Sequence, residues 1–207
     1  MNQNLSVKKK YWRYLPLRFF LEKKIKSVTN RTLNHFDGCI GENEEILDIG
    51  AGCGWIGQCL RKKKNAQVTL LDVIDFNQTD LKLILYDGKK MPFLDNSFDV
   101  VLLICVLHHC DEPLEVLKEA KRVTKDRIII IEDTFTFWFE KPFLYFLDTL
   151  INLVVGLFLT TPFSENMAFN FKKISEWKKI FSSLNLKLIY KKEWFQSRRL
   201  ACFVLKK

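Results

Sequence analysis

The sequence predicts an α/β fold, with a doubly wound, mainly parallel seven-stranded sheet and an antiparallel C-terminal hairpin strand. Short apolar runs alternate with amphipathic stretches along most of the chain, which is the pattern of repeated β–α units. One run, residues 98–104, is hydrophobic almost throughout, as expected for a strand covered on both faces. Strand-like stretches flank residues 196–198 and predict a closing hairpin, which requires an antiparallel strand.

Each predicted strand is bounded by a helix or by turn residues. The strands are expected at residues 45–49, 67–72, 81–86, 98–104, 127–132, 186–194 and 199–205. Apolar residues recur at helical spacing in the stretches between several of them. The helices are expected at residues 15–36, 55–64, 113–124 and 173–184.

Composition limits the organisation and the setting of the chain. A length of 207 residues with 48% hydrophobic residues allows one sizeable core. We expect a helical extension or lid at residues 1–43 and one domain at 44–207, with an apolar helical cap inserted at about 135–170. The six cysteines form no CxxC pair, which favours a reducing, cytoplasmic compartment. The net charge of +9 permits contact with nucleic acid or an anionic membrane but selects neither.

A glycine-rich turn is the strongest sequence signal for a ligand site. Residues 47–54 read Leu-Asp-Ile-Gly-Ala-Gly-Cys-Gly, placing glycines between a hydrophobic strand and a helix. Without side chains, such a turn lets a ligand approach the backbone closely. Asp72 ends the second strand and Asp87 follows the third, so in a parallel sheet both carboxylates should open beside this turn. They could accept hydrogen bonds from hydroxyls or amines.

Residues 46–54 resemble the first motif of the class I S-adenosylmethionine-dependent methyltransferases, which have a Rossmann-like fold. Later stretches agree in order and spacing: Asp87-Gly88, Met91-Pro92-Phe93, residues 96–101, and Leu107-His108-His109. The resemblance implies that Asp72 accepts from the ribose hydroxyls, Asp87 from the adenine amine, and the backbone at Cys105 from the methionyl amino group. The full set of cofactor-binding residues it implies is Asp48, Gly50, Ala51, Gly52, Asp72, Val73, Asp87, Gly88 and Cys105.

His108 and His109 follow the fourth strand, where the reacting side of such sites lies. Either could orient a substrate or take its proton, and they are the catalytic candidates. A core-edge histidine needs no special role, so the structural interpretation stays open. Cys105, His108, His109 and Cys110 are too crowded in sequence for an ordinary tetrahedral zinc site, and we expect no metal.

Other functions compete with methyl transfer. Residues 52–57 also satisfy GxGxxG, which with Asp72 is compatible with an NAD(P)-dependent oxidoreductase. The additional Gly50 and Asp87, and the short chain, disfavour that alternative. A catalytically inactive, cofactor-binding interaction module also remains open, as does an RNA or protein methyltransferase. The fourth strand runs into Ile104-Cys105-Val106-Leu107 and therefore lacks the loop typical of enzymes that methylate exocyclic base amines.

The acceptor is suggested only by residues 135–163, which are rich in leucine and aromatic residues. The uncharged part, residues 149–164, is shorter than the roughly 20 residues of a spanning helix, so no transmembrane segment is expected. The segment is either a cap packed on the domain or a lid that also touches a membrane surface. We expect methyl transfer to a hydrophobic small-molecule or lipid-like acceptor, with S-adenosyl-L-homocysteine as product.

Overall fold

A computed structural model describes residue 23 and residues 26–159, 170–196 and 198–207. Within 151–159 it describes the backbone only. The first part of the predicted helix at 15–36 and the end of the cap at 135–170 therefore lie outside the described residues. Residues 26–33 are helical, in agreement with the remainder of that first helix.

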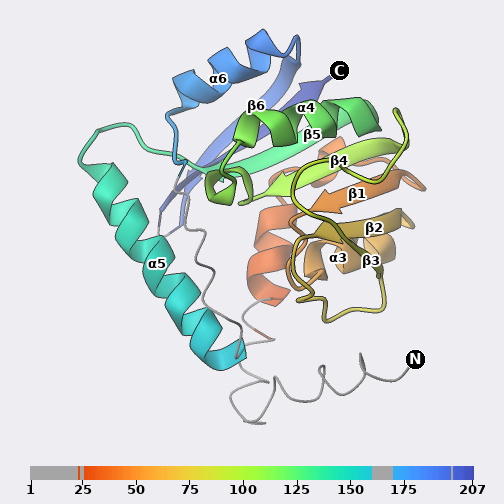
Figure 1. Ribbon diagram of the computed structural model, residues 1–207, viewed down its shortest axis with the longest axis horizontal. Coiled ribbons are helices and arrows are strands. Elements are labelled where there is room, and N and C mark those ends of the chain that lie inside the picture. Colours follow the sequence, from red (N-terminus) through yellow and green to blue (C-terminus); the bar gives the residue numbers. More distant parts are fainter. Residues whose placement is uncertain (1–22, 24–25, 160–169, 197) are drawn as a thin grey trace.

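The sheet has seven strands in the order β3-β2-β1-β4-β5-β7-β6 (Figure 1). Their bounds are β1 Glu45–Ile49, β2 Gln67–Asp72, β3 Lys82–Leu85, β4 Phe98–Ile104, β5 Thr124–Asp133, β6 Lys187–Phe195 and β7 Arg199–Lys206. The first five strands in this order are parallel, whereas β7 is antiparallel to both β5 and β6. The predicted fold class is confirmed.

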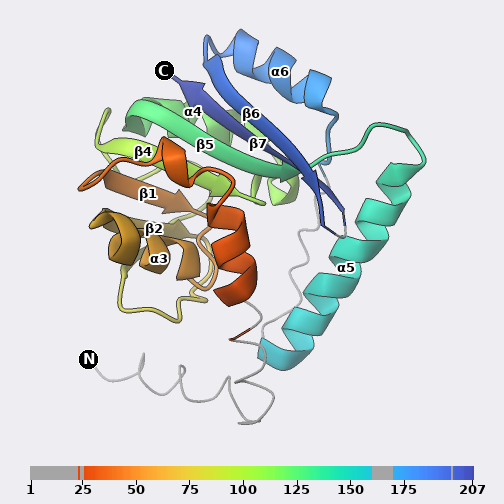
Figure 2. The same ribbon diagram turned by 180° about the vertical axis from the view of Figure 1, so that it is seen from behind.

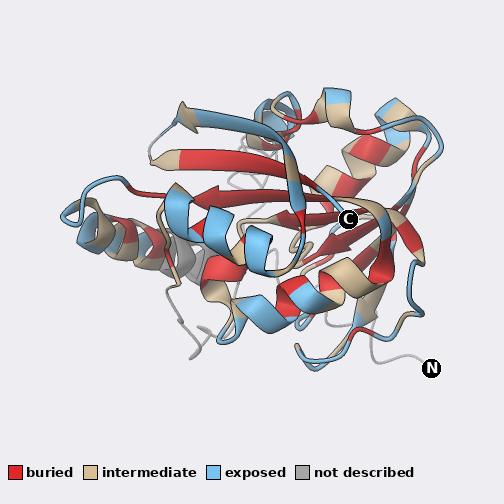
Figure 3. Ribbon diagram, turned by 90° about the horizontal axis from the view of Figure 1, so that it is seen from above, coloured by how far each residue is buried: buried red, intermediate tan, exposed pale blue. Residues whose placement is uncertain are grey.

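Helices cover both faces of the sheet. The helices are α3 Trp55–Lys64, α4 Pro113–Val123, α5 Glu140–Leu159 and α6 Ile174–Ser183, with short 3-10 turns η1 Asp37–Cys39 and η2 Leu107–His109. α4 and α6 lie on one face (Figure 1), and α3 lies with helical residues 26–33 on the other (Figure 2). Trp177 and Phe181 of α6 belong to the first apolar cluster, and Leu33 and Leu60 to the second. The middle strands are buried between these layers (Figure 3).

The predicted boundaries agree with the observed ones to within a few residues, and the largest difference among the strands is at the start of β5. We expected this strand at Arg127, but it begins at Thr124, directly after α4. The backbone N–H groups of Asn96 and Ser97 donate to the carbonyls of Arg122 and Val123, which joins the end of α4 to the start of β4. These bonds hold the chain extended where a loop was expected.

Helix α5 lies beyond the carboxyl ends of β1 and β4 (Figures 1 and 2). It is anchored near its start by Leu144, which packs with Phe135 and Phe171 in a small apolar cluster. An exposed apolar stripe at helical spacing begins one residue before α5 and continues along it; this α5 stripe consists of Phe139, Phe143, Phe146 and Leu150. Within the described part of the chain, no helix combines the length and the hydropathy needed to cross a membrane.

Candidate functional site

The glycine turn after β1 adopts a conformation that ordinary side chains disfavour. Gly50, Gly52 and Gly54 have φ angles of +63°, +51° and +76°. A Cβ on Gly50 would lie 2.5 Å from Cγ2 of Val106, so the turn packs directly against the loop after β4. A Cβ on Gly52 would meet no atom within 4 Å. The turn therefore leaves bare backbone facing open space at Gly52.

Asp72 connects the end of β2 to this turn. Its Oδ2 accepts a hydrogen bond of 2.9 Å from the backbone N–H of Gly52, and its Oδ1 accepts one of 2.7 Å from the N–H of Val73. Asp72 is largely buried, with 9% of its surface exposed. The predicted neighbours Gly52 and Asp72 are in direct contact, and Asp72 holds the turn in shape.

Asp48 lies under the turn and is almost fully buried. Burial, reinforced by the negative charge of Asp72, raises the pKa of Asp48 to about 7, although the backbone N–H of Gly57 acts in the opposite direction. One of its carboxylate oxygens, Oδ2, has no hydrogen-bond partner among the described residues. Asp48 thus supports the turn from inside and does not face a ligand from the surface.

Asp87 and Gly88 follow β3 at the same edge of the sheet. Leu85 pairs with Asp72 in the ladder, and the N–H of Tyr86 donates to the Asp72 carbonyl, so the chain enters the loop beside the end of β2. Gly88 has a φ of +79°, and a Cβ there would lie 3.5 Å from Cγ1 of Val73. Val73 is 54% exposed although apolar. Val73 and Gly88 thus lie side by side as a partly exposed apolar surface, next to the carboxylate of Asp87.

Cys105 leaves β4 with a φ of +56°, a conformation unusual for a residue with a side chain. Its N–H donates to the carbonyl of Ile131 at 2.7 Å, which keeps it within the sheet. Burial raises the pKa of its thiol well above the usual range, so the thiol stays protonated. Only the backbone of Cys105 is suited to a binding role.

His108 is fully buried and bound to a carboxylate that the sequence analysis did not select. Its Nδ1 lies 2.6 Å from Oε2 of Glu132, at the end of β5. Oε1 of the same glutamate accepts from the N–H groups of Val106 and Leu107. Burial lowers the pKa of His108, but Glu132 and Asp148 outweigh it and raise that pKa to about 10. His108 is therefore charged at neutral pH.

His109 is half-exposed beside its neighbour, with the two ring centroids 4.0 Å apart. Its Nε2 lies 3.8 Å from Oδ2 of Asp148 on α5, and Oδ1 of Asp148 lies 3.4 Å from Nη1 of Arg198. Arg198 also pairs with Asp133, Nε to Oδ1 at 2.8 Å. Glu132, Asp133, Asp148 and Arg198 were all missed by the sequence analysis. Two signals were available for the acids: Glu132 and Asp133 end the fifth strand, and Asp148 interrupts an apolar stretch. No local signal marked Arg198.

His108, His109 and Asp148 each offer a ligand atom, and these atoms lie within 4.8 Å of one another. Such a group could hold a cation. The guanidinium of Arg198 already lies beside Asp148 and repels a second positive charge. We therefore assign no metal here, and the expectation of none stays a prediction.

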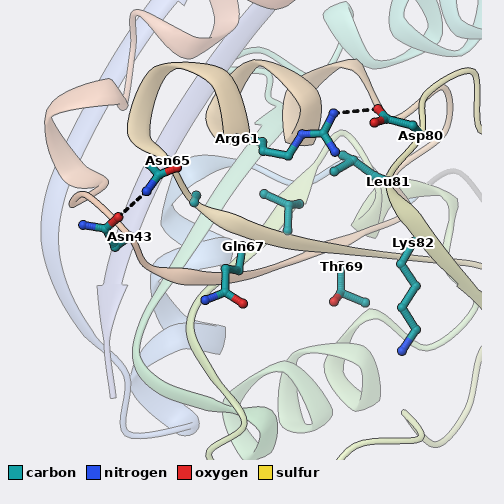
Figure 4. Close-up of a pocket in the computed structure, with 10 residues that line it drawn as sticks. Asn43, Arg61, Asn65, Gln67, Thr69, Asp80, Leu81 and Lys82 are labelled. Carbon is teal, nitrogen blue, oxygen red and sulfur yellow. Dashed lines mark hydrogen bonds and ion pairs between the residues drawn. The ribbon is translucent and has the colours of Figure 1, made fainter.

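A hollow at the opposite edge of the sheet does not belong to this site. It lies at the amino ends of β2 and β3, and its lining is mostly polar and includes two hydrogen-bonded pairs (Figure 4). Arg61 donates to Asp80, and Asn65 donates to Asn43, both at 2.6 Å. Ligands of open α/β sheets bind at the carboxyl ends of the strands, so we do not assign the cofactor to this hollow.

The strand order, the glycine turn and the carboxylates beside it define a class I methyltransferase domain. Residues 47–131 match the model of a methyltransferase domain family.

Curated relatives agree with this class. The chain is 28% identical to the demethylmenaquinone methyltransferase of Thermotoga maritima over 56% of each chain. It is 31% identical to the ubiquinone/menaquinone biosynthesis C-methyltransferase UbiE of Rickettsia typhi over 40% of this chain and 41% of the relative. The match thus spans only about half the length of these relatives.

The solved structures support the fold alone, because their sequence identities are low. A SAM-dependent methyltransferase of Methanosarcina mazei superimposes with a TM-score of 0.60 at 19% identity, covering 81% of this chain and 94% of the other. One from Aquifex aeolicus gives 0.59 at 16% identity, covering 86% and 88%.

Proposed function

We propose that this protein binds S-adenosylmethionine at the carboxyl ends of β1 to β4 and transfers its methyl group to an apolar, lipid-like acceptor. The observation that carries the cofactor half is the hydrogen bond from the Gly52 N–H to Asp72, beside backbone that no side chain covers. The match to a methyltransferase domain favours this function over an NAD(P)-dependent oxidoreductase.

The residues at this edge fit the parts of the cofactor in chain order. Gly50, Ala51 and Gly52 offer backbone to the methionine and ribose, while Asp48 supports them from below. Asp72 is largely buried but holds its carboxylate beside the turn, where ribose hydroxyls can donate to it. The apolar surface of Val73 and Gly88 suits the flat adenine ring, and the carboxylate of Asp87 suits its amine. The carbonyl of Cys105 can accept from the methionyl amino group.

The protein's part in the reaction is to align and to exclude water. When bound, S-adenosylmethionine supplies a sulfonium methyl group that is already electrophilic. The protein therefore needs neither a nucleophile of its own nor a covalent intermediate. Its residues bring the acceptor into line and keep bulk solvent away, and alignment alone can contribute several kcal/mol, on the order of 7–11, to lowering the barrier.

Support for an apolar acceptor comes from α5 and from the relatives. The α5 stripe and the aromatic residues just before it, Phe137 and Trp138, are exposed beyond the carboxyl ends of the strands. Two relatives carry names that specify quinone methylation. The stripe, on a chain of net charge +9, suits a peripheral contact with an anionic membrane that dissolves such an acceptor.

Titration calorimetry with S-adenosylhomocysteine tests the cofactor half. Asp72→Ala removes the carboxylate proposed to accept from the ribose hydroxyls. The dissociation constant of the variant for S-adenosylhomocysteine should rise at least about ten-fold, which corresponds to roughly 1.4 kcal/mol. Asp80→Asn, an exposed acid at the opposite edge, is the matched control and should bind like the wild type. Unchanged affinity in Asp72→Ala would overturn the assignment.

Tritiated methyl transfer tests the acceptor half. The protein is incubated with methyl-labelled S-adenosylmethionine and either reduced demethylmenaquinone in detergent or a host-cell extract separated into lipid, RNA, protein and small molecules. We expect label in the organic phase. Label confined to RNA or protein would select those alternatives, and binding of S-adenosylhomocysteine without any transfer would select the interaction module.

A further inference from the structure

Helix α5 brings one buried acid to the two histidines that follow β4. Asp148 is 3% exposed in a helix that is otherwise largely apolar. Its Oδ1 lies 3.8 Å from Nε2 of His108, and its Oδ2 lies 3.8 Å from Nε2 of His109. Arg198, from the far end of the chain, approaches the same carboxylate. The acid is thus the point at which α5, the β4 loop and the hairpin meet.

The two histidines stand in opposite electrostatic environments. His108, clamped between Glu132 and Asp148, carries a positive charge and cannot accept a proton. For His109, burial and the charge of His108 lower the pKa to about 4, with Arg198 acting in the same direction and Asp148 and Glu132 against it. His109 is therefore neutral at pH 7. Adjacent groups whose environments separate their pKa values are a sign of divided acid and base roles.

His109 also lies on the loop that packs against the proposed cofactor site. Val106, three residues earlier, touches the position where a Cβ of Gly50 would be, so this loop packs against the glycine turn. The side chain of His109 is 36% exposed, whereas that of His108 is 1% exposed. Of the two, only His109 can meet an acceptor brought to the cofactor.

We propose that His109 is the acceptor-side base and that Asp148 is the positioning residue which orients it. The inference rests on the proposed function. Asp148 faces Nε2 and favours a proton there, which leaves Nδ1 to receive the proton of the acceptor. The bond from sulfur to the methyl carbon breaks with its electron pair left on sulfur, the acceptor atom bonds to that carbon, and the proton lost by the acceptor moves to Nδ1.

A base of low pKa suffices for this step. The proton of the acceptor becomes more acidic as its lone pair or π electrons are shared with the methyl group. Transfer of this proton to a neutral imidazole is therefore favourable once methyl transfer is well advanced, even though it would be unfavourable before methyl transfer begins. Because Asp148 lies on α5, the base is complete only when this helix is in place over the strand ends.

The test compares His109→Ala, Asp148→Asn and the control Asp80→Asn in full-length protein. Calorimetry with S-adenosylhomocysteine should give dissociation constants within about two-fold of the wild type for all three. With methyl-labelled S-adenosylmethionine and either reduced demethylmenaquinone or the lipid fraction of the extract, kcat should fall roughly 10²–10⁴-fold in His109→Ala and about ten-fold in Asp148→Asn. Added imidazole should partly restore His109→Ala.

The pH profile separates positioning from a merely structural role. Activity should be lost as the pH falls through the pKa of His109, because the base must be neutral. The charge of Asp148 raises that pKa, so Asp148→Asn should move the acidic limb of kcat to lower pH. Wild-type kcat in His109→Ala, an unmoved limb in Asp148→Asn, or activity that chelation abolishes and Mg²⁺ or Zn²⁺ restores would each overturn the proposal. If the wild type itself neither binds S-adenosylhomocysteine nor transfers methyl groups, the proposed function fails first.

Discussion

Gly50 and Gly52 share a left-handed backbone but differ in what surrounds them. A methyl group on Gly50 would collide with Val106, whereas one on Gly52 would enter open space. The first glycine is therefore required by the packing of two loops, and the second by the approach of a ligand. The sequence motif treats the two as equivalent, and the structure separates their roles.

Alanine at each glycine should divide stability from binding. Gly50→Ala should lower the free energy of unfolding by about 2–4 kcal/mol, since left-handed strain of roughly 1–2 kcal/mol adds to overpacking. Gly52→Ala should lower the free energy of unfolding by only about 1–2 kcal/mol, from left-handed strain alone, but weaken S-adenosylhomocysteine binding at least about ten-fold. Urea denaturation and calorimetry measure the two effects. Gly38→Ala, with open space around it, is the control, and normal binding by Gly52→Ala would contradict the assignment.

At this scale the sequence predicts residues whose role follows from local position. Asp72 and Asp87 were found because strand ends of a parallel sheet share one edge. Asp148 and Arg198 were not, since no local pattern brings residues 148 and 198 to His108. Their contacts arise from the path of α5 and from the pairing of β7, which are long-range features.

Among the elements, α5 is the one whose surroundings the sequence left undecided between a packed cap and a lid. Leu144 is buried, but the α5 stripe faces outward, so in the part of α5 whose side chains are described, residues 140–150, much of the apolar surface stays exposed. The strands were predictable because their alternation and length are local properties. The orientation of an apolar helix depends on which partner covers it, and composition does not specify that partner.

Exposed phenylalanines on α5 should control membrane contact. The double variant Phe143→Ser/Phe146→Ser should reduce co-sedimentation with anionic vesicles at low salt at least about ten-fold, because each buried aromatic ring contributes roughly 1.5–3 kcal/mol. Leu94→Ser, an 83% exposed apolar residue in the loop before β4, is the control and should bind like the wild type. Failure of the wild type to co-sediment would exclude the peripheral contact.

At the scale of the whole molecule, the antiparallel strand β7 joins the two apolar clusters of the core. β7 lies between β5 and β6 and contributes to both apolar clusters, Phe203 to one and Val204 to the other. The hairpin was predicted, but which of its strands lies inside the sheet and which forms its edge was not stated. A signal was present: residues 200–205 are continuously apolar, as an interior strand requires, whereas residues 187–193 carry several charges.

Removing a buried side chain from β7 should therefore lower the free energy of unfolding of the whole domain. Phe203→Ala removes a fully buried ring that packs against Phe181, and urea denaturation should show a loss of about 3–5 kcal/mol. Phe195→Ala, in the same hairpin but 76% exposed, should change stability by less than about 0.5 kcal/mol. Equal effects of the two substitutions would show that β7 is not the interior strand.

The insertion of β7 beside β5 has a consequence during synthesis. On the ribosome, β1 to β5 emerge before β7, and the nascent sheet then carries an unpaired, isoleucine-rich edge along β5. More than sixty residues separate the two strands, so this edge remains open for several seconds at a translation rate of about 5–20 residues per second. Until β7 arrives, newly made chains are at their most vulnerable to pairing with one another and most dependent on chaperones.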